Sequence, residues 1–131
     1  MPLPQFQPLP LESARAPISD RDWIFEIKWD GFRALLYSEK DSLRLVSRNG
    51  NTFKSFPGLC EGLARDLKAR CCVLDGEIVC LDSHGRPQFR DLLFRRAEPV
   101  FYAFSGTNTR SRMMKRRCSG SAMARTRVIF R

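Results

Sequence analysis

Lys28 is the first residue whose type and surroundings suggest chemistry, and it lies in the stretch FEIKWDGFR of residues 25–33. A lysine amine attacks phosphorus only when unprotonated, so its pKa must be lowered by desolvation or by nearby cations. Apolar neighbours could desolvate Lys28, Arg33 is a nearby cation, and Gly31 would let backbone and nucleotide approach closely. The alternative is an exposed strand lysine before an Asp-Gly turn, and this stretch alone favours that alternative.

A second stretch, SRNGN at residues 47–51, contains the Asn49-Gly50 pair, which is a strong signal for a tight turn between two strands. Arg48 precedes the turn, where its guanidinium could form two parallel hydrogen bonds with a ribose or phosphate. The alternative is a hairpin turn without any binding role.

A third stretch, VLDGEIV at residues 73–79, places two acids inside an otherwise apolar strand. A buried carboxylate needs a cation, a metal or hydrogen-bond donors, so Glu77 could accept from ribose hydroxyls or help to hold a divalent metal. The equally weighted alternative is a bulge or hairpin at Asp75-Gly76 with Glu77 facing water. A fourth stretch, VFYAF at residues 100–104, offers an aromatic face for a purine, although most of its rings suit a strand core.

The elements that must position these residues follow from periodicity and turn signals. Leu59, Leu63 and Leu67 recur every four residues and predict a helix. Alternation and β-branched or aromatic content predict the strands. The expected elements are strands at 22–29, 32–39 and 41–48, a helix at 56–69, a strand at 71–82 interrupted by Asp75-Gly76-Glu77, a turn at 83–87, a short helix at 89–96 and a strand at 99–104.

These elements predict an α+β domain with a mixed, mostly antiparallel sheet and flanking helices. We expect Lys28, Arg48 and Glu77 to converge on one cleft. Residues 1–20 are proline-rich and are interpreted as an extended N-terminal arm. No apolar run of membrane-spanning length and no signal peptide are apparent, and a reducing cytoplasm explains the five unpatterned cysteines better than a zinc site does.

The formal net charge of +9 is concentrated at one end of the chain. Residues 105–131 contain eight Lys and Arg and no acid, whereas the preceding residues are nearly balanced. This composition predicts a disordered tail that binds nucleic acid without sequence preference.

Together, in this order and spacing, WIFEIKWDGFRALL, VSRNGNTF, VLDGEIVCLD and FYAF closely resemble the ATP-dependent DNA ligases. This family lies in the covalent nucleotidyltransferase superfamily, which also contains mRNA capping enzymes and RNA ligases. The sequences of these motifs are most similar to those of the small bacterial ligases of double-strand-break repair. The resemblance covers about Phe6 to Phe104 and implies that residues 21–104 form the first half of an incomplete, ATP-grasp-like adenylation domain.

The resemblance also implies roles for individual residues. Lys28 matches the lysine that takes AMP from ATP, and Glu26 matches a residue beside the adenine edge. Arg33 and Arg48 match arginines near the ribose and phosphates or near the 5′-phosphate of the nick. Glu77 matches the acid that contacts the ribose and assists metal binding.

An aromatic residue packs on the adenine in this family, and Phe104 matches it, with Phe101 and Tyr102 as alternatives. The cofactors implied are ATP and Mg²⁺, and the partners are nicked double-stranded DNA and DNA end-joining proteins. In the family reaction the lysine attacks the α-phosphate, AMP passes to the 5′-phosphate, and the 3′-hydroxyl displaces AMP.

The resemblance stops after Phe104, where the later family motifs and the C-terminal OB domain have no counterpart. We interpret the chain as truncated, through a reading-frame shift or naturally, with an unrelated tail at 105–131. We therefore expect no detectable nick sealing and at most feeble self-adenylation by the isolated chain. The alternatives are an RNA ligase or capping-type nucleotidyltransferase, and a non-catalytic fragment that binds nucleotide or nucleic acid.

Overall fold

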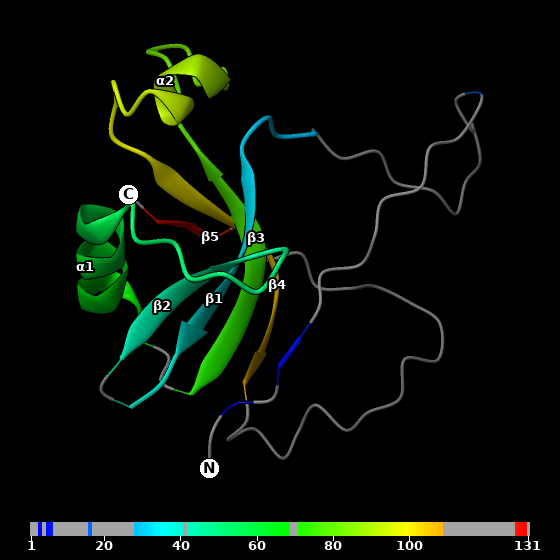
Figure 1. Cartoon of the computed structure of the whole chain (residues 1–131), viewed down its shortest axis with the longest axis vertical. Coiled ribbons are helices and arrows are strands. Elements are labelled where there is room, and N and C mark those ends of the chain that lie inside the picture. Colours follow the sequence, from blue (N-terminus) through cyan, green and yellow to red (C-terminus); the bar gives the residue numbers. More distant parts are fainter. Residues whose placement is uncertain are drawn as a thin grey trace.

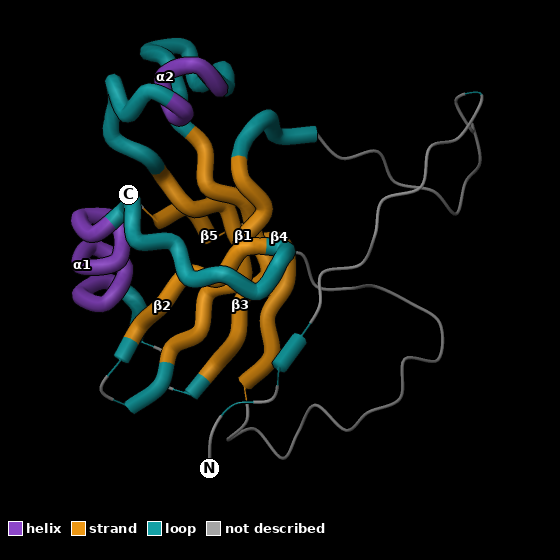
Figure 2. Tube along the Cα trace, in the orientation of Figure 1, coloured by secondary structure: helices purple, strands orange, loops and turns teal. Residues whose placement is uncertain are grey.

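Figure 1 shows the fold of the chain, a computed structural model that describes residues 3, 5–6, 16, 28–40, 42–68, 71–108 and 128–130. Helices lie beside a sheet of five strands in the order β2-β1-β3-β4-β5 (Figure 2). The elements are β1 (Phe32–Ser38), β2 (Leu43–Ser47), α1 (Pro57–Asp66), β3 (Cys72–Val79), α2 (Phe89–Leu93), β4 (Val100–Asn108) and β5 (Val128–Phe130).

The α+β class is confirmed, but the sheet is not mixed: each pairing between described strands is antiparallel. The β1–β2 connection spans only residues 39–42, which is too short for the crossover that a parallel pair requires. Among the described helices, neither has the length and apolarity needed to cross a membrane.

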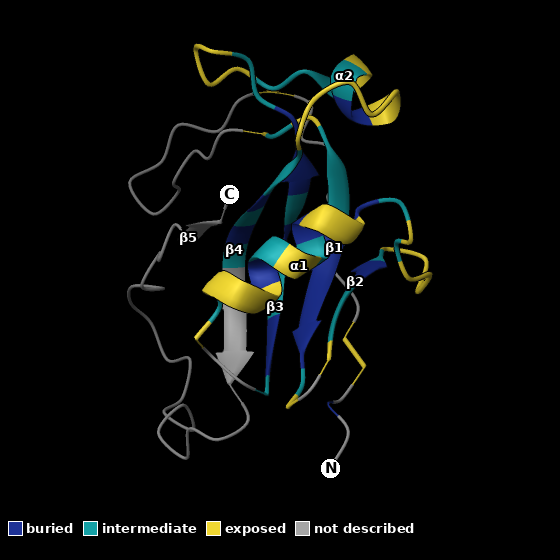
Figure 3. Cartoon of the chain, turned by 90° about the vertical axis from the view of Figure 1, so that its left-hand side faces the viewer, coloured by how far each residue is buried: buried dark blue, intermediate teal, exposed yellow. Residues whose placement is uncertain are grey.

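One face of the sheet packs beneath α1 and forms the main core (Figure 3). Leu59 and Leu63 lie one helical turn apart and both point inward, as their spacing predicts. Leu67 follows the last helical residue, and its N–H donates to the Leu63 carbonyl at 2.9 Å. Alternate residues of the strands complete this core: Ala34, Leu36, Leu45, Ile78, Phe101 and Ala103.

Strand β3 runs through Asp75-Gly76-Glu77 without the expected interruption. The irregularity lies in its pairing with β4, where Asp75 opposes Ser105 but Gly76 opposes Ala103. Phe104 is therefore the extra residue of a β-bulge, which bends the strand locally and redirects a side chain. A bulge was the alternative that the sequence left open at this position, and it is present.

Two glycines allow backbones to approach more closely than any side chain would permit. A Cβ on Gly76 would lie 2.1 Å from the Tyr102 carbonyl oxygen and 2.6 Å from the Phe101 ring. A Cβ on Gly31 would lie 2.1 Å from the carbonyl oxygen of Ile78. The close approach at Gly31 is to the backbone of β3, whereas the sequence led us to expect an approach to a nucleotide.

Strand β4 continues past Phe104, where the sequence places a domain boundary, and ends at Asn108. Val128–Phe130 pairs with it as β5, within the tail that the sequence predicts to be disordered. Their β-branched and aromatic side chains favour strands, and β4 offers them an unpaired edge. Residues 109–127 lie outside the described part of the chain, so the division at 104 stays a prediction.

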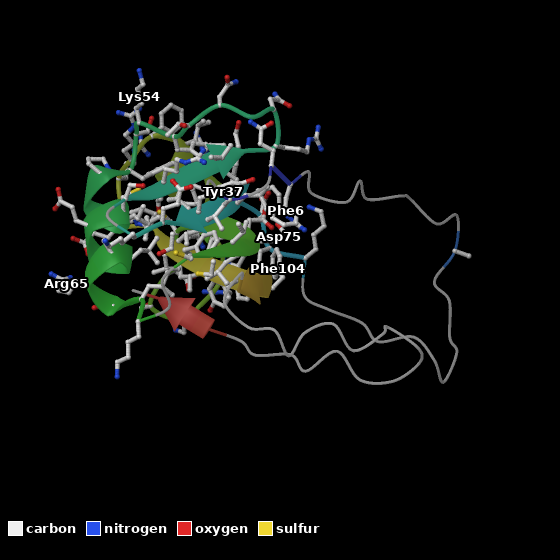
Figure 4. The ribbon with its side chains drawn as sticks, turned by 90° about the horizontal axis from the view of Figure 1, so that it is seen from below. Phe6, Tyr37, Lys54, Arg65, Asp75 and Phe104 are labelled. Atoms are coloured by element: carbon white, nitrogen blue, oxygen red, sulfur yellow. The ribbon has the colours of Figure 1, made fainter. Side chains whose placement is uncertain are left out.

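Part of the N-terminal arm packs on the face of the sheet opposite α1. Leu3 is buried in a second apolar cluster with Leu35, Tyr37, Val46 and Val73. The Phe6 N–H donates a hydrogen bond to the Tyr37 hydroxyl at 3.0 Å. Figure 4 shows Phe6 and Tyr37 on the same side of the sheet as Asp75 and Phe104, away from α1.

Candidate functional site

A hollow of about 460 Å³ lies where the segment before β1 and the turn after β2 meet the sheet. Four of the expected site residues line it, namely Lys28, Arg33, Arg48 and Glu77. They come from three segments that are far apart in the sequence, so the expected convergence on one cleft is present. Glu26 lies outside the described residues, and Phe104 is not among the lining residues.

Lys28 is exposed and lies in a loop rather than at the end of a strand. Residues 22–27 of the expected strand lie outside the described part, and residues 28–30 adopt no strand. The next residue, Trp29, stacks on Tyr102 of β4 with ring centroids 4.1 Å apart. This stacking holds the backbone next to Lys28 against β4, although Lys28 itself lies in a loop.

Arg33 is held from two sides. Its Nε and Nη2 donate to the two carboxylate oxygens of Asp75 at 2.7 and 2.6 Å, and its guanidinium lies 4.8 Å from the centroid of the Phe104 ring. Such a paired and stacked guanidinium keeps its charge and a fixed orientation. Arg33 is thus a cation that is held in position, and its planar guanidinium suits phosphate recognition.

Asp75 is the residue that the sequence interpretation missed as a partner of the site. It was noted only as one of two acids in a strand. The available signal was its spacing, since residues two apart on a strand share a face and Asp75 lies two before Glu77. Its partner Arg33 lies directly opposite Glu77 in the β1–β3 register and reaches Asp75 diagonally.

Glu77 is half-buried and faces the hollow, not open water. Its Oε1 accepts a hydrogen bond from the Gly31 N–H at 3.0 Å, which ties β3 to the loop that carries Lys28. Burial raises the pKa of the Glu77 carboxyl, although the Gly31 hydrogen bond and the charges of Arg33 and Lys28 oppose the rise.

The Asn49-Gly50 turn is present as predicted and sets the rim of the hollow. Gly50 has φ +82°, a conformation that glycine adopts without strain, and its N–H donates to the Ser47 carbonyl at 2.9 Å. Ser47 and Asn49 line the hollow beside Arg48, whose side chain is exposed. Arg48 is therefore an exposed cation at the rim, whereas Arg33 is paired with Asp75.

Aromatic rings supply the apolar wall of the hollow. Phe32 and Phe53 both line it, and their ring centroids lie 6.0 Å apart. Phe101 is fully buried in the main core, which removes it as a base-stacking alternative. Tyr102 and Phe104 each contact a residue that lines the hollow. Tyr102 contacts Trp29, and Phe104 contacts Arg33.

A metal at this site would depend chiefly on Glu77. The described residues contain no cluster of three metal-ligating side chains. One Glu77 oxygen remains beyond its Gly31 hydrogen bond, and Mg²⁺ commonly binds one or two carboxylates together with substrate phosphates and water. The residues present therefore fit a magnesium ion delivered with a polyphosphate, but not a metal held by protein ligands alone.

The hollow combines a flat aromatic wall, two arginines, a lysine and a half-buried carboxylate. Its volume lies within the usual range for small-molecule sites. Aromatic faces suit a base, a carboxylate suits ribose hydroxyls, and guanidinium and ammonium groups suit phosphates. The arrangement is thus chemically matched to a nucleotide.

The comparison with protein families gives the decisive observation: residues 8–116 match the family described as "ATP dependent DNA ligase domain". The chain belongs to the ATP-dependent DNA ligase domain family. The match covers most of the chain and includes every described residue of the hollow.

Characterised relatives lead to the same family. The multifunctional non-homologous end joining DNA repair protein LigD of Mycobacterium tuberculosis is 38% identical over 91 residues, which cover 68% of this chain and 12% of that protein. DNA ligase C1 of Mycolicibacterium smegmatis is 43% identical over 84 residues, covering 60% of this chain and 24% of the relative.

A solved structure, "mycobacterial DNA ligase D complexed with ATP and MES", is 37% identical. It aligns with a TM-score of 0.48 over 60% of this chain and 27% of that chain. The chain thus spans well under a third of the length of each of these ligases.

Proposed function

We propose that the hollow binds ATP and that Lys28 is the residue that accepts AMP, as the first step of ATP-dependent DNA ligation. The observation that carries this proposal is the convergence of Lys28, Arg33, Arg48 and Glu77 on one hollow in a chain of this family. In this proposal Glu77 accepts from the ribose, Arg33 and Arg48 face the phosphates or the 5′-phosphate of a nick, and Glu26 lies beside the adenine edge. Phe104 or Tyr102 packs on the base.

The covalent step is a displacement at the α-phosphorus. The deprotonated Nζ of Lys28 forms a P–N bond, the bond to the β-phosphate oxygen breaks, and pyrophosphate leaves. Mg²⁺, where bound near Glu77 and the phosphates, supplies charge neutralisation. Lys28 is exposed at the hollow and so can be reached by a nucleotide, while Arg33 is fixed by Asp75 before any ligand arrives.

The wider function that we propose is sealing of nicked double-stranded DNA in repair, in the cytoplasm and alongside DNA end-joining proteins. It is supported by the names of the relatives, since LigD is described as a non-homologous end joining DNA repair protein. Complete nick sealing needs further groups on the phosphates and a clamp on the DNA. We propose that the isolated chain adenylates itself feebly and does not seal nicks.

The test is incubation with magnesium and α-labelled ATP, followed by detection of acid-labile label on the protein. We expect weak label that disappears in Lys28→Ala and persists in Lys54→Ala, because Lys54 is exposed and does not line the hollow. Binding of unlabelled nucleotide, read as a rise in Tm, should favour ATP over GTP.

Label that persists in Lys28→Ala would refute the role of Lys28. If the chain shows no label and no ATP-induced shift in Tm, the nucleotide site as a whole is refuted. Preference for GTP would favour a capping-type nucleotidyltransferase instead.

A further inference from the structure

A second hollow, of about 550 Å³, lies between α1 and the segment that follows α2. Gly58, Gly62 and Arg65 line it from α1, and Arg95, Arg96 and Glu98 line it from the other side. Glu98 is the single acid among these lining residues, against three arginines. We call this hollow the arginine cleft.

Two arginines of this cleft, Arg95 and Arg96, are held by neutral partners. Arg95 Nη2 donates to the Ser55 hydroxyl at 2.9 Å, across 40 residues of sequence, and the Arg96 guanidinium lies 5.1 Å from the centroid of the Phe94 ring. Within the described part of the chain, neither arginine forms an ion pair with a carboxylate. Their charge is thus oriented but not neutralised, in contrast to Arg33 in the first hollow.

The third arginine of the cleft is weakly paired. Arg65 Nε lies 3.5 Å from an Asp66 carboxylate oxygen, and both side chains are largely exposed. Exposed pairs of this kind contribute little energy and exchange readily for another anion. Figure 4 shows Arg65 projecting from α1 away from the sheet.

The arginine cleft adjoins the nucleotide site. Phe53 lines the first hollow and Phe56 lines the arginine cleft, and the centroids of these two rings lie 5.8 Å apart. Lys54 is exposed, and Figure 4 shows it pointing outward from the molecule. Arg48 at the first hollow, Lys54 in the segment between the two sets of lining residues, and Arg95 and Arg96 in the cleft are all exposed cations.

We propose that the arginine cleft binds the phosphate backbone of duplex DNA beside the nick. Duplex DNA carries about one negative charge per 1.7 Å of helix axis, and cations that contact phosphates position a duplex without reading its sequence. Exposed cations in a cleft next to the nucleotide site suit this ligand. The inference takes its DNA substrate from the proposed function.

The test compares the full chain with Arg95→Gln/Arg96→Gln, using a fluorescent, 5′-phosphorylated nicked duplex and anisotropy between about 50 and 200 mM salt. Glutamine is a polar side chain without the charge. We expect the slope of log affinity against log salt to flatten by about one unit for each arginine that contacts a phosphate. The control, Lys68→Gln/Arg90→Gln, removes the same charge from exposed positions outside the cleft and should leave the slope unchanged.

An unchanged slope in the cleft variant, or equal flattening in the control, would overturn the proposal. Arg95→Lys/Arg96→Lys should keep the wild-type slope, because it keeps the charge. If the slope of log affinity against log salt flattens as much in this variant as in the glutamine variant, the arginines act by maintaining structure and the proposal fails. Thermal unfolding of each variant shows whether it is folded at the assay temperature.

The same proteins separate this inference from the proposed function. If Lys28 takes AMP but the salt slope does not depend on Arg95 and Arg96, only the proposal for the arginine cleft is wrong. If the slope depends on them but Lys28 takes no AMP, the cleft stands as a DNA-binding surface and the ligase chemistry fails.

Discussion

The two faces of the sheet use the same strands for different purposes. The face under α1 is apolar and closed, with Leu36, Leu45, Ile78 and Phe101 all at 0% exposure. The opposite face combines a small apolar cluster around Tyr37 with the charged row of site residues.

The contrast is sharpest along single strands. Phe101 of β4 is fully buried in the core, and its neighbour Tyr102 stacks on Trp29, the residue after Lys28. In β3, Ile78 is sealed in the core and Glu77 faces the hollow. Since side chains alternate across a strand, a rigid core on one face fixes the positions of polar groups on the other. The stability of the fold and the geometry of the site should therefore respond differently to mutation of adjacent residues.

The largest expected effect is on the core face. Phe101→Ala removes a fully buried ring and should lower the free energy of unfolding by about 3–5 kcal/mol. Tyr102→Ala, one residue away, loses a stacked aromatic pair and should cost only about 0.5–1.5 kcal/mol beyond its partial burial. Urea denaturation of both variants measures the difference, and equal losses would contradict the separation of the two faces.

The second prediction concerns the Arg33–Asp75 pair on the site face. Asp75→Asn weakens two charge-assisted hydrogen bonds between side chains that are 27% and 22% exposed. We expect a loss of about 1–2 kcal/mol in unfolding free energy. The ATP-induced rise in Tm should also shrink, because Arg33 is no longer held in place.

A double-mutant cycle with Arg33→Gln isolates the coupling between these two side chains. Additive losses in the cycle would mean that the pair contributes no interaction energy of its own. The corresponding cycle between Arg44 and Asp75 serves as a control, because Arg44 stacks on Tyr37 instead.

The smallest effect is the pH dependence contributed by Glu77. Because its folded-state pKa is raised above the ordinary value of 4.5, the folded chain binds the proton more tightly than the unfolded chain. The resulting stabilisation is complete at low pH and is lost as the pH rises through the raised pKa. Glu77→Gln removes this dependence, so it should gain stability relative to the wild type as the pH increases from about 4 to 7. Tm measured across this range tests the sign, and a relative loss at neutral pH would show that attraction to Arg33 and Lys28 dominates.

Local patterns were enough to predict much of the fold. Alternation predicted β1 and β2, the leucine spacing predicted α1, and Asn49-Gly50 predicted the turn that carries Arg48. Each of these depends on residues that are close in sequence, so the physical cause is visible in a short window.

What the sequence did not reveal depends on pairing between distant segments. Arg33 and Asp75 are 42 residues apart, and only the β1–β3 register brings them together. The bulge at Phe104 arises because β3 and β4 differ by one residue in their pairing, which neither strand shows alone. The family resemblance predicted Glu77 as a site residue, but its hydrogen bond to Gly31 became apparent only in the folded structure.

The hydrogen bond between Gly31 and Glu77 also has a consequence for synthesis on the ribosome. Its two ends are 46 residues apart, so Lys28 leaves the ribosome well before Glu77 is made. At the usual 5–20 residues per second, the delay is roughly 2–9 s. The β1–β2 hairpin can form during that interval, because its strands are close in sequence, whereas the β1–β3 pairing must wait. A nascent chain therefore carries Lys28, the nucleophile that we propose, for seconds without Glu77 beside it.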